Sequence, residues 1–162
     1  MNRDDKNTSE IQNTIQYRRL TEQDLDAFIA LRIRQLREEG AKEDLDLVPA
    51  LRDYYGRHME DGTFVSWIAL DGERIVGTSG MSFVEKPPYF GCPNGRIGLL
   101  SSMFTEPGYR RRGIAKTLLS HVVDEARAYG CGSVQITASD EGVLLYTAFG
   151  FEKNHNFMQY KL

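Results

Sequence analysis

Residues 103–115, Met-Phe-Thr-Glu-Pro-Gly-Tyr-Arg-Arg-Arg-Gly-Ile-Ala, decide the fold. The apolar run 97–105 predicts a strand, and Glu-Pro-Gly at 106–108 predicts a turn. Apolar residues then recur at helical spacing from about Arg112 to Tyr129. The first turn of a helix has unpaired N–H groups and the positive end of the helix dipole. The stretch is therefore a candidate phosphate-binding site.

The residues around this helix start fit such a site. Gly113 has no Cβ and Ala115 has a small one, so an anion can approach the backbone closely. Four basic side chains add positive charge: Arg110, Arg111, Arg112 and Lys116. A solvated turn would show the same features, so the spacing alone leaves both interpretations open. The GxxxxGK[ST] and GxGxxG patterns of other phosphate-binding loops are absent.

Length and composition limit the classes of protein that fit. A chain of 162 residues suits one domain, since domains run to about 100–200 residues. The net charge of −3 argues against a nucleic-acid partner. Cys92 and Cys131 form no CxxC pair, so we expect no zinc site, no disulfide framework and a cytoplasmic setting. No other metal-ligand cluster stands out.

The polar residues 1–14 predict an N-terminal tail without the apolar segment of a signal peptide, followed by a single domain over 15–162. The chain has no apolar run of membrane-spanning length, so we expect no membrane partner.

The rest of the chain alternates between helical and strand periodicity. Thr21 and Asp24 have the spacing of a capping box, so a helix is expected to begin near Glu22. Residues 45–59 predict a second helix, and Asp71-Gly72 predicts a hairpin turn. The remaining expected elements are strands at 15–20, 64–70, 74–84 and 133–138, a loop at 89–95, a helix at 141–147, and final strands at 151–153 and 157–161.

This order predicts a mixed α/β (α+β) domain with one sheet and helices on its faces. The unit 97–138 is strand, helix, strand, which implies a right-handed crossover between parallel strands.

The pattern Arg110-x-x-Gly113-x-Ala115 follows a strand and opens a helix, and Leu145-Tyr146-x-x-x-Gly150-Phe151 follows later. This layout resembles the GNAT N-acetyltransferase superfamily, whose signature is Arg/Gln-x-x-Gly-x-Gly/Ala with a distal Leu-Tyr-x-x-x-Gly-Phe. The resemblance is specific over 97–151. Over 15–84 the order of elements is only compatible with it.

The resemblance implies a mostly antiparallel sheet that splays beside the cofactor strand, with acetyl-CoA as co-substrate. Met103, Phe104 and Thr105 match the strand end that pairs with the pantetheine arm. Tyr146 matches the tyrosine that protonates the departing thiolate, and a phenol holds its proton at neutral pH. The matching backbone N–H groups for the pyrophosphate belong to Arg111, Arg112, Gly113, Ile114, Ala115 and Lys116.

Two departures from the family pattern affect the site. Ser139 stands where many members have an asparagine, so a polar contact to the cofactor is weaker or comes from Asp140. The usual glutamate base is missing from the two splayed strands. Ser101, Ser102 and Glu85 stay open as candidates, and an amine that arrives neutral needs no strong base.

The main hypothesis is an N-acetyltransferase that moves acetyl to a primary amine of a small molecule or of a peptide or protein, by direct attack in a ternary complex. The alternative is a CoA-binding sensor or interaction module without turnover. The acidic stretch Glu38, Glu39, Glu43 and Asp44 is interpreted first as a solvated loop, and otherwise as a region that attracts a cationic amine. The segment 157–161 is a candidate for pairing across a homodimer.

Overall fold

The computed structural model describes residues 14–154 and 156–162. The predicted tail, 1–14, lies outside the described residues except for Thr14. Within the described part, none of the helices has the length and apolar character that a membrane span requires. The elements are β1 (Gln16–Arg19), η1 (Glu22–Asp24), α1 (Leu25–Glu38), α2 (Val48–Glu60), β2 (Phe64–Val65), β3 (Trp67–Asp71), β4 (Arg74–Glu85), β5 (Arg96–Thr105), η2 (Pro107–Tyr109), α3 (Ile114–Tyr129), β6 (Ser133–Gln135) and α4 (Asp140–Phe149).

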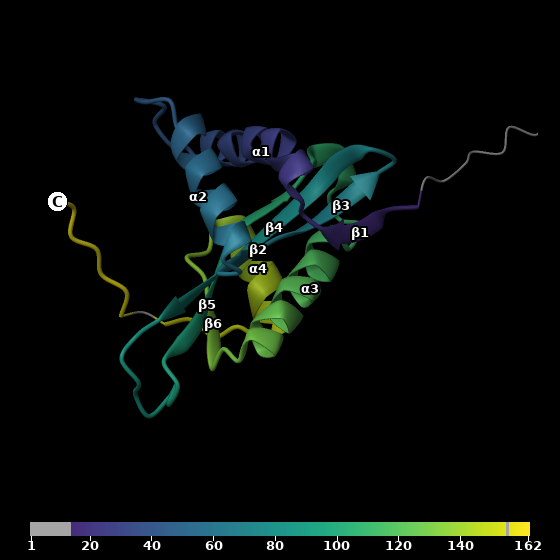
Figure 1. Cartoon of the computed structure of the whole chain (residues 1–162). Helices are drawn as coiled ribbons and strands as arrows, with labels where there is room; N and C mark the ends of the chain where they lie inside the picture. Colours follow the sequence, from purple (N-terminus) through teal and green to yellow (C-terminus); the bar gives the residue numbers. More distant parts are fainter. Residues whose placement is uncertain (1–13, 155) are drawn as a thin grey trace, which may run out of the picture.

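The described strands form one open sheet in the order β1-β3-β4-β5-β6, and β2 pairs with β4 beside β3. Every pairing is antiparallel except that of β5 with β6. Helices α1 and α2 lie on one face of the sheet and α3 lies on the other (Figure 1). This is the mixed α/β arrangement that the sequence predicts.

Side-chain alternation along the strands divides the core between the two faces. Ile68 packs with Phe28 on the α1 face, whereas the next residue, Ala69, packs with Leu118 on the α3 face. A Cβ added at Gly77 would lie 2.8 Å from Cγ2 of Ile114. Glycine at this position therefore lets α3 approach β4 closely.

The capping interaction predicted before α1 is present. The N–H of Thr21 donates to the Asp24 carboxylate at 2.8 Å, and the single turn η1 precedes α1. Arg18 donates to the same carboxylate at 2.7 Å. The hydrogen bond from Arg18, supported by those from Thr21 and opposed by partial burial, lowers the pKa of Asp24 to about 2.

The chain's single tryptophan joins three elements. The ring of Trp67, on β3, stacks on His121 of α3 with centroids 4.0 Å apart. Its Nε1–H donates to Glu125 at 2.8 Å. Arg19, on β1, donates to the same carboxylate at 2.6 Å, so β1, β3 and α3 meet at one polar contact.

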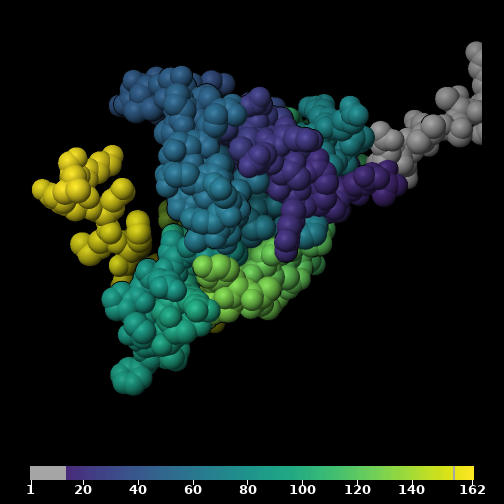
Figure 2. Space-filling view, viewed as in Figure 1, coloured from purple at the N-terminus to yellow at the C-terminus, as the bar shows by residue number. Residues whose placement is uncertain are grey.

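The prediction of final strands at 151–153 and 157–161 is wrong, because the described residues there have no strand pairing. Phe157, Met158 and Tyr160 are 73%, 91% and 89% exposed, and the C-terminal segment stands clear of the body (Figure 2). Apolar side chains do not make a strand where no neighbouring strand takes the hydrogen bonds. Several boundaries also move. Strand β6 ends at Gln135 rather than residue 138, α3 begins at Ile114 rather than Arg112, and α2 begins at Val48 rather than residue 45. The strand predicted over 64–70 is divided into β2 and β3, and the helix predicted over 141–147 extends over 140–149.

Candidate active site

The sheet opens between β5 and β6. The two strands pair only where Ile97–Leu99 lies beside Ser133–Gln135. Strand β6 ends there, whereas β5 continues to Thr105. Beyond Leu99, this edge of β5 has no partner strand among the described residues. An extended ligand that contains amide groups can pair with such an edge as an added strand.

A β-bulge lies beside this opening. The register of β4 against β5 shifts between Thr78 and Gly80. Opposite the shift, Ser102 has a positive φ of 54° and is buried. The Thr78 hydroxyl donates to the Ser102 carbonyl at 2.7 Å, which holds the irregular backbone in place. Bulges bend a strand and redirect its groups, so this one marks where β5 leaves the regular sheet.

The start of α3 has the geometry of an anion site. Arg111 and Gly113 have left-handed backbones, with φ of 64° and 80°. The first hydrogen bond into the helix runs from the N–H of Thr117 to the carbonyl of Gly113, so the preceding amides have no helical acceptor. A Cβ at Gly113 would meet no atom within 4 Å. Backbone donors and open space therefore coincide here, as an anion requires.

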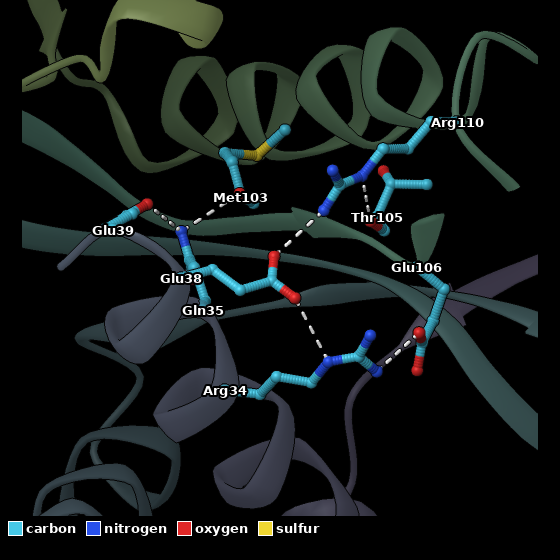
Figure 3. A network of polar contacts seen from close by, with 8 residues as sticks. All are labelled: Arg34, Gln35, Glu38, Glu39, Met103, Thr105, Glu106 and Arg110. Atoms are coloured by element: carbon cyan, nitrogen blue, oxygen red, sulfur yellow. Dashed lines mark hydrogen bonds and ion pairs between the residues drawn. The ribbon is translucent and has the colours of Figure 1, made fainter. Parts of the chain in front are cut away.

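The arginines before the helix differ in what they contact. Arg110 donates from Nε to the carbonyl of Thr105 at 2.9 Å and from Nη2 to Glu38 at 3.1 Å (Figure 3). It therefore ties the loop to β5 and α1 instead of leaving its charge free at the helix start. The guanidinium carbon of Arg112 lies 5.2 Å from the ring centroid of Tyr109. Arg111 is exposed beside the opening of α3, and so is Lys116.

Tyr146 is buried on α4 and belongs to the same apolar cluster as Met103. Burial, with a further contribution from the carboxylate of Glu39, raises the pKa of Tyr146 to about 12. The phenol therefore keeps its proton throughout the neutral range. Ser139 starts this helix: its Oγ accepts from the N–H of Gly142 at 3.2 Å. Its hydroxyl is thus used as an N-cap, which fixes α4 and with it Tyr146.

At the strand end 103–105, the backbone is more accessible to a ligand than the buried side chain of Phe104. Phe104 is buried, and the guanidinium carbons of Arg34 and Arg110 lie 5.6 and 5.8 Å from its ring centroid. The structure thus brings Met103–Thr105, the segment 110–116 at the start of α3 and the cluster that contains Tyr146 to one region. Ile114 faces the core, so only its backbone N–H is available to a ligand.

Sequence reasoning missed Gln35 and Glu106. Gln35 is 7% exposed, and its Nε2 donates to Glu39 at 2.9 Å and to the carbonyl of Met103 at 3.1 Å. Glu106 is 7% exposed and is held by Arg34 at 2.6 Å. One signal was present: Gln35 stands two helical turns after Phe28, on the buried face of α1.

The base candidates from the sequence lie apart from one another. Glu85 is at the other end of the β4–β5 ladder from Thr105 and is paired with Arg96 at 3.8 Å. Ser102 is at the bulge, with its Oγ 3.4 Å from the Tyr55 hydroxyl. Glu85 is therefore remote from the opening, and Ser102 faces α2.

Comparison with known proteins adds the family. The model of the Acetyltransferase (GNAT) family matches residues 25–151. The chain belongs to this family. The resemblance drawn from the two sequence motifs is thus confirmed, and so are the acyltransferase class and the mixed α/β fold. Acetyl-CoA, the expected co-substrate, is the acetyl donor that the family uses.

Individual relatives extend the comparison. A crystal structure of a predicted acetyltransferase with acetyl-CoA from Clostridium acetobutylicum is 28% identical, with a TM-score of 0.88 over 91% of this GNAT chain and 96% of that one. Rat N-acetyltransferase 8B is 35% identical over 56% of this chain and 40% of its own length. Glucosamine 6-phosphate N-acetyltransferase of Trypanosoma brucei brucei is 26% identical over 55% of this chain and 58% of its own length. The chain spans about half the length of the curated relatives it matches.

Proposed function

We propose that this GNAT protein is an N-acetyltransferase that moves acetyl from acetyl-CoA to a primary amine of a small molecule, or of a peptide or protein, by direct attack in a ternary complex. One observation carries the proposal: β5 has an edge without a partner strand beyond Leu99, and the chain runs from the end of β5 at Thr105 through a short turn to the unpaired amides at Gly113. This combination suits a donor with an amide-containing arm and a pyrophosphate.

In this proposal the backbone of Met103, Phe104 and Thr105 pairs with the pantetheine arm. The N–H groups of residues 111–116 hold the pyrophosphate, with the charges of Arg111, Arg112 and Lys116 beside them. Arg110 acts by holding the loop against Thr105 and Glu38. Ser139 acts by capping α4.

Tyr146 supplies the general acid. The neutral nitrogen of the acceptor forms a bond to the thioester carbonyl carbon, and the carbon–sulfur bond breaks. The sulfur leaves with the electron pair and takes the proton of the Tyr146 phenol. The phenolate then regains a proton from solvent, which receives the proton lost by the nitrogen. A phenol with its pKa raised to about 12 stays protonated until this step.

The alternative is a CoA-binding module without turnover. The buried phenol favours the enzyme, because a protein that only binds CoA needs no proton donor near the thiol. The acceptor class, the cytoplasmic setting and a homodimer stay predictions from the sequence.

The test is calorimetric binding of acetyl-CoA, followed by thiol release with a panel of amines. We expect binding, and release with at least one amine class. Tyr146→Phe should then lower kcat about a hundredfold while the acetyl-CoA Kd stays within about twofold. Binding without release, in the wild type, would favour the sensor. Absence of binding would contradict the site.

A further inference from the structure

We infer that the carboxylate of Glu39, directly after α1, binds the amino group of the acceptor, and that Gln35 positions it. This inference rests on the proposed N-acetyltransferase activity. It adds a substrate class: acceptors whose amino group is cationic when it binds and releases that proton to solvent before the neutral nitrogen attacks.

Glu39 differs in charge balance from its neighbours in Figure 3. Glu38 pairs with Arg34 at 3.3 Å and with Arg110 at 3.1 Å. Glu106 pairs with Arg34 at 2.6 Å. Across residues 14–154 and 156–162, no basic side chain forms an ion pair with Glu39. Its negative charge is therefore available to a ligand, whereas those of the other two are compensated.

A hydrogen bond from Gln35 holds the carboxylate of Glu39 in position. Gln35 is 7% exposed and its amide nitrogen bridges Oε1 of Glu39 and the carbonyl of Met103. The carboxylate is thus tied to the strand end proposed to hold the donor. A carboxylate has two oxygens with about four acceptor positions, so the bond from Gln35 leaves most of them for an amino group.

Glu39 lies on the same side of the molecule as the proposed acid. Gln35 ties its carboxylate to Met103, which packs in the same apolar cluster as Tyr146. In agreement with this placement, the carboxylate of Glu39 contributes to the raised pKa of Tyr146.

The placement of Glu39 runs against local helix energetics. Carboxylates are unfavourable at a helix C-terminus, where the dipole is negative. Glu38 has arginine partners there that offset the effect, and Glu39 has a neutral amide instead. Departures from local rules without a compensating contact are concentrated at functional sites.

The experiment compares Glu39→Gln with the wild type on benzylamine, which is cationic near neutral pH, and on aniline, which is neutral. Aniline is measured as an acceptor or as a competitive inhibitor. We expect Glu39→Gln to raise the KM for benzylamine about tenfold. The KM for acetyl-CoA and the KM or inhibition constant for aniline should stay within about twofold of the wild-type values. Glu73→Gln, an exposed change of the same charge in the β3–β4 turn, should leave all three unchanged.

Gln35→Leu tests positioning. It should reproduce the benzylamine-specific rise in KM, since Glu39 keeps its charge but loses its support. An equal rise for both amines would indicate only disturbed packing and would overturn the role of Gln35. Equal benzylamine KM values in wild type and Glu39→Gln would overturn the inference alone. A wild type that acetylates neither these amines nor spermidine, glucosamine and a lysine peptide would overturn the proposed function as well.

Discussion

At the scale of single residues, the environment of Tyr146 decides both its chemistry and its response to pH. The side chain is 6% exposed, and burial is the larger cause of its raised pKa. Because the folded-state pKa lies above the ordinary tyrosine value, the folded protein holds this proton longer than the unfolded chain does. The resulting stability is complete below about pH 10 and is lost as the pH rises towards 12.

We therefore expect the wild type to lose stability relative to Tyr146→Phe at alkaline pH. Between about pH 8 and about pH 11 the difference in unfolding free energy should shift by about 1 kcal/mol in favour of the variant. Denaturant unfolding of both proteins at the two pH values measures it. An identical pH dependence would contradict the buried, protonated phenol.

Asp24 gives the opposite dependence, because its pKa is lowered to about 2. Its contribution is present above the ordinary aspartate pKa of about 4 and is lost as the pH falls through about 2. Asp24→Asn should cost about 1 kcal/mol at neutral pH, with the gap closing on acidification. Urea titrations across that range provide the measurement. The control is Asp26→Asn, because the side chain of Asp26 is 81% exposed. Its unfolding free energy at neutral pH should differ much less from that of the wild type.

At the scale of elements, hydrophobic periodicity predicted the helices whose formation depends on the local sequence. The spacing of Leu118, Val122 and Ala126 predicts α3, and all three are buried. The final strands failed because strand formation depends on a distant neighbour, and the described segments at 151–154 and 156–162 have none.

The candidate site divides in the same way. Gly113 and Tyr146 were predicted because each lies in a motif that can be read along the chain. The pairing of Gln35 with Glu39 and Met103 was not, because it joins residues from α1 and β5 that only the fold brings together. The acidic stretch that includes Glu39 was seen in the sequence, but its four carboxylates look equivalent there.

Gly113→Ala tests the turn into α3 as an element. Its φ of 80° is strained for alanine by about 1 kcal/mol, and Gly62, with φ of 77°, is strained to the same degree. Neither added Cβ would meet an atom within 4 Å. Both variants should lose equal stability, and only Gly113→Ala should weaken acetyl-CoA binding, by about tenfold in calorimetry. Equal affinities would contradict the assignment of this turn.

At the scale of the whole molecule, the sheet separates the apolar cluster packed under α1 and α2 from the two clusters that contain α3. The polar network of Figure 3 joins α1 to β5. The opening arises from unequal strand lengths, since β5 extends beyond β6. The helices on the two faces, not a continuous sheet, therefore hold the site together.

Removal of residues 157–162 tests how much the C-terminal segment contributes. Phe157, Met158 and Leu162 are 73%, 91% and 116% exposed, so the unfolding free energy should change by less than about 0.5 kcal/mol. Chemical denaturation at two protein concentrations measures this and detects any association. A loss above about 1 kcal/mol, or one that depends on concentration, would mean that the segment packs in solution.

The stacking of Trp67 on His121 gives the protein a built-in optical probe. Since the chain has one tryptophan, fluorescence excited selectively from tryptophan and not from the eight tyrosines arises from a single place, the junction of β1, β3 and α3. Emission during unfolding thus follows the docking of α3 on the sheet, while circular dichroism follows all helices together. If the unfolding curves from fluorescence and circular dichroism coincide, α1 and α2 unfold with the rest as one cooperative unit. If the two curves separate, the protein unfolds as two cooperative units.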